Sequence, residues 1–415
     1  MQEFICIMVS LGILVVLLRL RVKLGRAMVL ASVALAALLA VTPQMLWSRL
    51  AEEWHDKELH ETTGYLLVSL TALLLLVNVL GKAMQETGVS QKLLPALQGL
   101  FKSRRFALAL IPLMMGMLPT PGGIMLSAPM VRDAGERMGL SRSRLAAINF
   151  HFRHQWEPVW PLFPAIQFTQ TLFGISAFTL ISYNLILPLA GVLGGTAGLL
   201  LFGVPPKNRD EQSKDRHFGV HLKDFAHGFW PIVLAAALYV GLTWPPAVGI
   251  FISIFGFLVV HKVPLNKWGD IFRAAAEPDK ALLILGALMF GVILRAADAI
   301  GAVVQFFTAS GISPYILIFI LPLFVGIATG MNLVTAMITF PFLLAYIGAG
   351  SEIKMGLEVL AYSGLVCGVL LTPVHLCLAL SASYFEAPLL KIIIKMLVPV
   401  TFIAGAGILM AIFFR

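Results

Sequence analysis

Apolar segments with few charges recur along the whole chain and are separated by short polar segments. A helix needs about 20 predominantly apolar residues to cross the hydrocarbon core of a bilayer. Spans are therefore predicted over residues 4–20, 26–42, 63–81, 145–166, 176–203, 229–243, 246–262, 281–300, 357–384 and 388–414. The pattern predicts an all-α polytopic membrane protein with about ten spans.

Two further apolar stretches, 106–131 and 315–347, are interrupted near their middle. Pro-Thr-Pro-Gly-Gly breaks the first at 119–123, and Thr-Gly-Met-Asn breaks the second at 329–332. Backbone groups left unpaired in hydrocarbon cost several kcal/mol each, so such a break persists only against protein, water or a ligand. Matched breaks in two halves of a membrane protein are the best sequence pointer to a binding site near the bilayer midplane.

Charges on its flanks indicate how the first interrupted stretch crosses the membrane. Cytoplasmic loops carry an excess of Lys and Arg, and basic residues stand on both flanks: Lys92, Lys102, Arg104, Arg105, Arg132, Arg137, Arg142 and Arg144. A hairpin that enters and leaves from the cytoplasm keeps both groups inside, whereas a single kinked helix, the alternative, would not. We therefore expect re-entrant helical hairpins over 106–131 and, from the outer side where charges are few, over 315–347.

The order of elements repeats in the two halves with opposite orientation. Residues 1–203 form the first repeat, with scaffold spans, the hairpin 106–131 and a broken span 145–166. A cytoplasmic linker, 204–227, leads to the second repeat, 228–415, with the hairpin 315–347 and a broken span 357–384. Such inverted-topology repeats are typical of secondary transporters. Both termini are expected outside the cytoplasmic membrane, and the first span is expected to be retained because its basic residues follow it.

Each broken span is interrupted beside a proline. The polar run from Asn149 to Pro158 lies inside an apolar segment, and Leu371-Thr-Pro-Val-His375 is its counterpart. Proline removes a helical hydrogen bond and frees a carbonyl. Helix ends gathered around one centre would present N–H groups and positive dipole ends to an anion.

Composition supports the membrane assignment and narrows the partners. The chain is 59% hydrophobic and 12% charged, with a mean hydropathy of +0.90. Its net charge of +9 lies in short loops, so the lipid bilayer and not nucleic acid is the expected partner. Cys6, Cys367 and Cys377 lie in apolar segments without CxxC spacing, which supports neither disulfides nor a zinc site.

Arg153 is the strongest candidate for contact with a ligand. A buried arginine in a spanning segment is costly and by default functional, and its planar fork suits a carboxylate or phosphate. The alternative is an internal ion pair with Glu157, one helical turn away.

Histidine and glutamate in the broken spans are candidates for ion coupling. Membrane-buried His and Glu recur in proton relays, which points to His154, Glu157 and His375. The alternative for each histidine is a bond to a carbonyl freed beside a proline. His151, His154 and Glu157 have a spacing that could face a metal, but no second ligand cluster accompanies them, so no metal or other cofactor is expected.

The hairpin tips offer hydroxyls, amides and exposed backbone that could bind a carboxylate or sodium. Sodium at Asn332 is the alternative coupling ion, and close helix packing is the alternative role of the small residues. The predicted substrate-binding residues are Thr120, Pro121, Gly122, Gly123, Ser127, Asn149, Arg153, Thr329, Gly330, Asn332, Thr335, Thr372 and His375.

Leu-Pro-Thr-Pro-Gly-Gly at 118–123, the run 149–158, Leu-Thr-Pro-Val-His at 371–375 and Ser-Ala-Ser-Tyr-Phe at 381–385 resemble a prokaryotic family, domain of unknown function 401. That family is grouped with the ion transporter superfamily of citrate, dicarboxylate and gluconate carriers. The resemblance implies a homodimeric, elevator-type carrier whose transport domain spans roughly 84–170 and 300–385. The tips differ from the Ser-Asn-Thr motif of the best-understood relatives.

Together these features predict a secondary active transporter of a small, anionic organic solute across the cytoplasmic membrane. A proton or sodium gradient would drive it, because the chain has no P-loop for ATP. A carrier or scramblase of a lipid-linked substrate, or a passive channel, is the alternative. An intramembrane enzyme is disfavoured because GxSxG and HExxH motifs are absent.

Overall fold

A computed structural model describes residues 2–56, 58–89, 104–117, 124–202 and 218–414, and all regular elements in these ranges are helical. The hairpin tip at 118–123 and most of the central linker lie outside the described residues. The predicted all-α class is confirmed for the described part of the chain.

Most helices described in the first half lie within the predicted spans and interrupted stretches. The helices of this half are α1 (Gln2–Arg19), α2 (Leu24–Leu38), α3 (Pro43–Asp56), α4 (Thr63–Glu86), α6 (Arg104–Gly116), α7 (Ile124–Glu136), α8 (Arg142–Arg153), α9 (Pro164–Phe173), α10 (Ala177–Asn184) and α11 (Ile186–Gly195). Of these, α3 and α9 lie largely outside the predicted ranges. A π-helical segment, Thr196–Leu201, continues α11.

The second half has the same order of long and interrupted helices. They are α12 (Phe218–Leu242), α13 (Pro246–Val260), α14 (Leu265–Ala275), α15 (Pro278–Ala296), α16 (Ala299–Ala309), α17 (Pro314–Thr329), α18 (Asn332–Ile347), α19 (Met355–Leu371), α20 (Leu376–Tyr384) and α21 (Leu389–Phe413).

The chain is a multi-pass membrane protein. In the described residues, six helices are long and apolar enough to cross a membrane, or eight if two bent helix pairs each count as one span. Large apolar side chains are exposed on these helices, for example Val68 of α4 and Leu409 of α21. Such a surface requires lipid around it, because soluble proteins rarely expose large contiguous apolar patches.

Both interrupted pairs pack as adjacent helices. α6 lies against α7, and α17 lies against α18. The second pair turns at Gly330, whose φ of 67° favours glycine, so the helix break predicted at 329–332 is present. Helices α8 and α9, and α19 and α20, are likewise separated by short non-helical segments.

Three short helices occupy segments that the sequence analysis treated as loops. α3 turns 107° from α2, and α16 turns 72° from α15. Helix α14 follows α13 and carries Trp268, Ile271 and Phe272 at helical spacing. Apolar residues at this period give a short helix one apolar face. Helices α3 and α14 were missed because their segments are too polar to span, and α16 because its 11 residues are too few. α3 is fixed through buried Glu53, whose Oε1 accepts a bond of 2.8 Å from Arg295 of α15.

The predicted linker boundary at 227 was wrong, since α12 already begins at Phe218. Residues 218–227 contain Phe218, Val220, Leu222 and Phe225 among charged residues. Because apolar and charged residues alternate here, mean hydropathy predicts a loop. The same pattern is compatible with a helix that extends out of the membrane.

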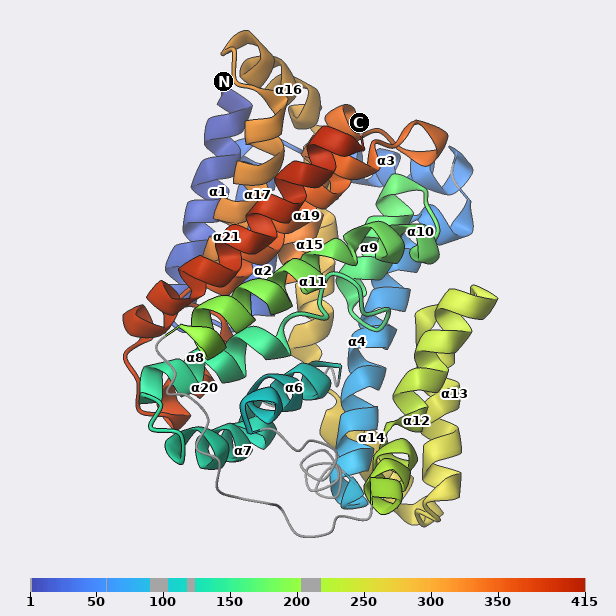
Figure 1. The fold of residues 1–415 in the computed structure, drawn as a ribbon. Coiled ribbons are helices and arrows are strands. Elements are labelled where there is room, and N and C mark those ends of the chain that lie inside the picture. The colour runs from blue at the N-terminus through green and yellow to red at the C-terminus, as the bar shows by residue number, and fades with distance from the viewer. Residues whose placement is uncertain (1, 57, 90–103, 118–123, 203–217, 415) are drawn as a thin grey trace.

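Corresponding helices of the two halves pack reciprocally across the molecule. α2 lies against α15, and α13 lies against α4. The first contact is close because Gly286 meets the backbone of Met28 and Val29. In Figure 1 both termini lie at the same end of the molecule as α3 and α16, whereas α7 and α14 lie at the opposite end.

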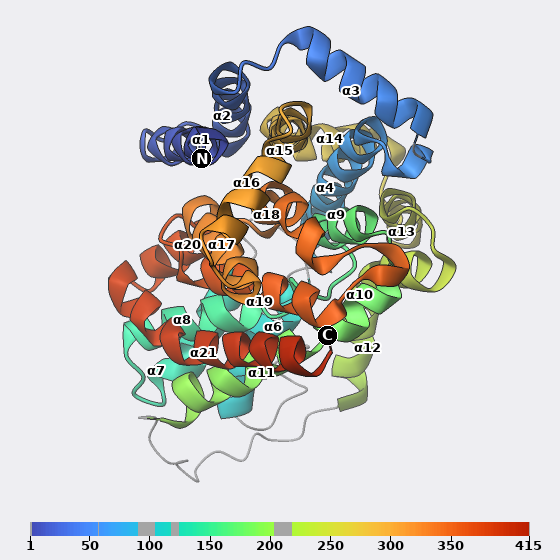
Figure 2. The same ribbon diagram turned by 90° about the horizontal axis from the view of Figure 1, so that it is seen from above.

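The helices fall into two packed groups, which Figure 2 separates when seen from above. One group joins α2, α4, α12, α13, α14 and α15. The other joins the paired and broken helices: α6, α7, α8, α11, α17, α18, α19, α20 and α21. Contacts of α9 with α4 and of α18 with α15 connect the groups.

Candidate functional site

A cavity of about 230 Å³ lies where the two helix breaks approach each other. Residues from both halves line it, as does α4 from the other helix group. Its lining comprises Leu74, Val77, Gly116, Arg153, His154, Glu157, Leu162, Phe163, Pro164, Ala165, Met331, Asn332, Leu333, His375 and Cys377. The polar members come from the broken spans and the start of α18, and α4 contributes apolar residues.

Each broken span caps the open carboxyl end of the neighbouring hairpin helix. The last carbonyls of a helix have no partner within it. Nη1 of Arg153 donates to the carbonyl of Met115 at 2.7 Å, and the indole of Trp156 donates to that of Leu113 at 2.9 Å. Both acceptors lie in the last turn of α6.

The second break repeats this arrangement on α17. The hydroxyl of Thr372 donates to the carbonyl of Ile327, and Nδ1 of His375 donates to the carbonyl of Gly330. The two halves therefore use the same device at equivalent places. His375 and Thr372 were predicted to bind substrate, and in the structure their side chains donate hydrogen bonds to backbone carbonyls. This structural role is enough to explain a polar side chain at each position.

Arg153 is buried, with 6% of its surface exposed, and lies at the cavity wall. Gly116 makes its position possible, because a Cβ on Gly116 would lie 2.0 Å from the Arg153 carbonyl oxygen. The guanidinium lies beside the thiol of Cys377 and close enough to Glu157 for their charges to attract. Arg153 thus has partners in both broken spans while bordering the space that a ligand would fill.

Glu157 and Asn332 connect the first broken span to the second hairpin. Nδ2 of Asn332 donates to Oε2 of Glu157 at 2.6 Å, and Oε1 of Glu157 lies 3.8 Å from Nε2 of His154. Asn332 is the first residue of α18 and therefore lies at the positive end of that helix dipole. The carboxylate, the amide and the imidazole form one polar wall.

Three candidate ligand atoms of a metal ion meet beside this wall. Nε2 of His154 and Nε2 of His375 are 2.9 Å apart. One ring nitrogen of each histidine and Sγ of Cys377 lie within 4.8 Å of one another. The cluster joins α8–α9 to α19–α20, and the sequence analysis did not anticipate it.

Several predicted site residues lie outside the cavity lining. The hydroxyl of Ser127 bonds Oδ1 of Asn149 at 2.6 Å, and the hydroxyls of Thr329 and Thr335 bond each other at 2.9 Å. These buried pairs tie hairpin helices to their surroundings. Thr120, Pro121, Gly122 and Gly123 lie outside the described residues.

His151 faces away from the cluster. Its Nε2 lies 2.9 Å from the carbonyl oxygen of Gly191, and Gln155 contacts the other ring nitrogen. The i, i+3, i+6 spacing of His151, His154 and Glu157 therefore does not gather three ligands, because the chain turns out of the helix after Arg153.

Sequence reasoning missed two polar groups, one half-buried and one fully buried. Cys377 was treated as an apolar residue, since nothing in its spacing relates it to residues 154 and 375. Glu358, in α19, is fully buried and accepts a bond of 3.3 Å from Nδ2 of Asn184. An acid within the apolar run 355–371 is a signal that could have revealed Glu358.

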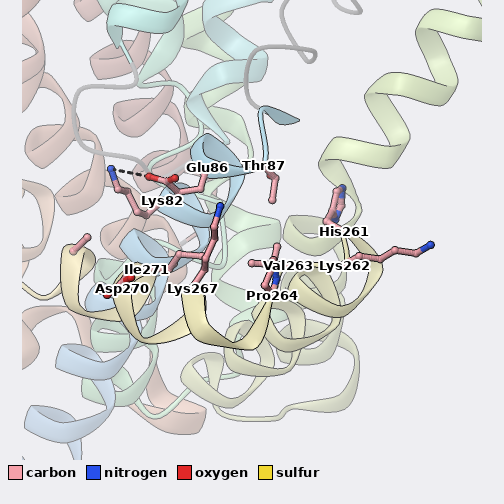
Figure 3. A pocket seen from close by; sticks show the side chains of 11 residues that line it. Lys82, Glu86, Thr87, His261, Lys262, Val263, Pro264, Lys267, Asp270 and Ile271 are labelled. Atoms are coloured by element: carbon pink, nitrogen blue, oxygen red, sulfur yellow. Dashed lines mark ion pairs between the residues drawn. The ribbon is translucent and has the colours of Figure 1, made fainter.

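A larger cavity, about 570 Å³, lies elsewhere, between the end of α4 and the α13–α14 turn. Figure 3 shows its charged side chains, including Lys267, and the ion pair of Lys82 with Glu86, whose Nζ and Oε1 are 3.6 Å apart. Both members of this pair are more than a third exposed. It is a solvated groove at the end of the molecule, and none of the predicted site residues that the structure describes lines it.

Comparison with known proteins gives a family that covers nearly the whole chain. Residues 4–414 match the family described as protein of unknown function, DUF401. No curated protein matches the chain.

Proposed function

Because the chain belongs to the DUF401 family, whose description assigns no activity, we propose from the site itself that the protein is a secondary active transporter. It moves a small organic anion across the cytoplasmic membrane by alternating access, driven by a proton or sodium gradient. The observation that carries the proposal is the cavity at the junction of both halves and both helix groups.

The cavity suits a small anion. Arg153 provides a permanent positive charge with a fork for a carboxylate or phosphate. The amino end of α18 adds backbone N–H groups and a positive dipole end. A volume of about 230 Å³ lies below the roughly 300–1,000 Å³ of pockets for drug-sized ligands, which favours a small metabolite.

Two contacts between the halves favour movement of the site as one body. The contact of His154 with His375 and the hydrogen bond of Glu157 with Asn332 hold the broken spans and the second hairpin together. Against them, α4 presents the apolar residues Leu74 and Val77 at the cavity, and a hydrogen bond from Gln167 of α9 to Ser69 of α4 would have to break for this movement. This difference supports an elevator-type carrier. The proposal also includes an inverted-topology repeat that contains the scaffold helices, and assembly as a homodimer.

Coupling residues are proposed in the same wall. His154 contacts His375 and lies 3.8 Å from Glu157, and these three residues would accept or release a proton as the cavity opens to either side. Sodium near Asn332 is the alternative. The hydroxyls of Thr329 and Thr335 are engaged in hydrogen bonds, and Oδ1 of Asn332 is a buried oxygen for which the described residues supply no partner.

Other classes explain fewer of these features. A lipid-linked substrate would need a path from the cavity to the bilayer, and a passive channel needs neither the Arg153 site nor contacts between halves. An intramembrane enzyme would need a nucleophile and base in hydrogen-bonding geometry. Cys377 lies near two histidines, but each histidine is held through Nδ1 by a backbone carbonyl, which fits a binding role.

A thermal-shift screen of the purified protein tests the binding site. Organic acids, amino acids and phosphates are compared at equal concentration, since a ligand at 100 times its Kd stabilises the folded state by about 2.7 kcal/mol. A hit should raise the melting temperature of the native protein and leave that of Arg153→Ala unchanged. Stabilisation of both proteins by the same anion would place its site elsewhere.

A further inference from the structure

The two imidazoles at the centre of the molecule face each other with their lone pairs. Nδ1 of His154 lies 2.6 Å from the carbonyl oxygen of Phe150, and Nδ1 of His375 contacts the carbonyl oxygen of Gly330. A carbonyl only accepts, so each Nδ1 carries the hydrogen. Each neutral ring then has an unprotonated Nε2, and these two atoms are 2.9 Å apart.

Two opposed lone pairs at this distance repel unless a cation lies between them. A proton shared by the rings is one solution, and a metal ion held by both is the other. The Sγ atom of Cys377, within 4.8 Å of a ring nitrogen of each histidine, gives the metal a third ligand that a shared proton does not need. Oε1 of Glu157, 3.8 Å from Nε2 of His154, gives it a fourth.

We propose that His154, His375 and Cys377 bind a borderline-soft divalent transition metal ion such as Zn²⁺, with Glu157 as the fourth ligand. Zinc prefers tetrahedral sites of nitrogen, sulfur and carboxylate oxygen, at about 2.0–2.3 Å from each ligand atom. A tetrahedron of these bond lengths separates its ligand atoms by roughly 3.3–3.7 Å. The two nitrogens need to move apart by only a few tenths of an ångström, and the neighbouring cavity provides the space.

The surroundings of the three atoms match those of metal ligands. Metal-bound histidines usually donate the second ring N–H to a carbonyl or carboxylate, which fixes the ring and its tautomer. Both imidazoles have such a carbonyl here. Glu157 is also oriented, because Asn332 bonds its Oε2 and leaves Oε1 on the side of His154.

The charges also balance. A thiolate and a carboxylate neutralise a divalent ion, because metal binding deprotonates the thiol. The guanidinium of Arg153, beside Cys377, then keeps its charge available for an anion in the cavity. The ion would join α8–α9 to α19–α20, and so fix the two halves to each other. This site goes beyond the transport function and does not require the metal to be cargo. With the ion bound, its three ligands from the proton-coupling set no longer exchange protons, so coupling falls to sodium near Asn332.

Cobalt titration of the purified full-length protein tests the proposal. Co²⁺ replaces Zn²⁺ in such sites and has visible absorption, and a bound thiolate adds a charge-transfer band in the near ultraviolet. The native protein should show both with one Co²⁺ per chain, and Zn²⁺ should displace it. Cys377→Ser should lose the charge-transfer band and bind at least about 10-fold more weakly, since even second-shell changes cost 10–100-fold.

The matched control is Cys367→Ser. Cys367 is a buried cysteine whose thiol contacts the carbonyl of Val400 and is not part of the cluster. This variant should retain the band and the affinity. Melting temperatures measured without metal distinguish loss of the site from loss of the fold in Cys377→Ser.

Two results would overturn the proposal. One is a native protein that shows no thiolate charge-transfer band, which would leave a shared proton between the histidines. The other is a band that persists in Cys377→Ser. Neither result would bear on transport, because anion-induced stabilisation that depends on Arg153 can be measured in the presence of a chelator.

Discussion

His154 and His375 meet through their Nε2 atoms at 2.9 Å although they are 221 residues apart in the chain. On the opposite side of each ring, Nδ1 donates to a backbone carbonyl of the same half of the chain: Phe150 for His154 and Gly330 for His375. The contact therefore joins two independently positioned broken spans. Any mechanism in which the two halves rock apart at this point would break it, whereas movement of both spans together past α4 would keep it.

Uptake should require the guanidinium of Arg153, and a lysine with the same positive charge should not replace it. Arg153→Lys retains the charge but cannot form the planar fork or reach the Met115 carbonyl in the same geometry. We expect loss of uptake by at least about 10-fold, equivalent to about 1.4 kcal/mol. Initial uptake rates against substrate concentration check this. Native kinetics in Arg153→Lys and Arg153→Ala, at equal amounts of inserted protein, would remove Arg153 from the site.

Glu157 and Asn332 should be energetically coupled. Their side chains bond at 2.6 Å across the two halves, and contacting residues show interaction energies of about 0.5–3 kcal/mol. The measurement is a double-mutant cycle with Glu157→Gln and Asn332→Ala, read as thermal stability and as uptake. Additive effects would show that this bond does not hold the halves together.

Gly116→Ala should disrupt the site although it adds only a methyl group. Its Cβ would lie 2.0 Å from the carbonyl oxygen of Arg153, and overpacking of this kind costs about 1–3 kcal/mol. Gly12→Ala, in α1, is the matched control, because its Cβ would meet nothing within 4 Å and alanine is a better helix former by about 1 kcal/mol. Equal melting temperatures and uptake for the two variants would contradict this packing.

The first hairpin should expose both of its flanks to the cytoplasm. Leu100→Cys and Arg137→Cys are compared for labelling by a membrane-impermeant maleimide in intact and inverted vesicles, with the native cysteines as background. Both should label only when the cytoplasmic face is accessible. Position 140, also expected inside, is a poor reporter because Leu140 is 8% exposed. Labelling from opposite sides would favour a single kinked crossing.

Local signals in the sequence predicted the helices well. Apolar run length predicted α4 and α21 to within a few residues, because bilayer thickness dictates it. Prolines 158 and 373 and the tip at 329–332 likewise indicated where helices break. Amphipathic α3, α14 and α16 were missed, since hydropathy alone does not distinguish a short surface helix from a loop.

The site was only partly predictable. Arg153, His154, Glu157 and His375 stand out as polar residues in apolar segments, and the cavity contains all of them. Their partners are set by tertiary packing. Nothing in the sequence reveals that Cys377 approaches His154, or that Arg153 bonds a carbonyl of α6.

Uptake into proteoliposomes tests the central claim most directly. The purified native protein and Arg153→Ala are reconstituted in parallel, and entry of a labelled anion identified by thermal shift is followed with and without an imposed proton or sodium gradient. We predict saturable uptake above equilibrium that requires the gradient, the native protein and Arg153. Entry that only equilibrates, regardless of the gradient, would indicate a channel, and no entry of any stabilising anion would contradict the assignment as a carrier.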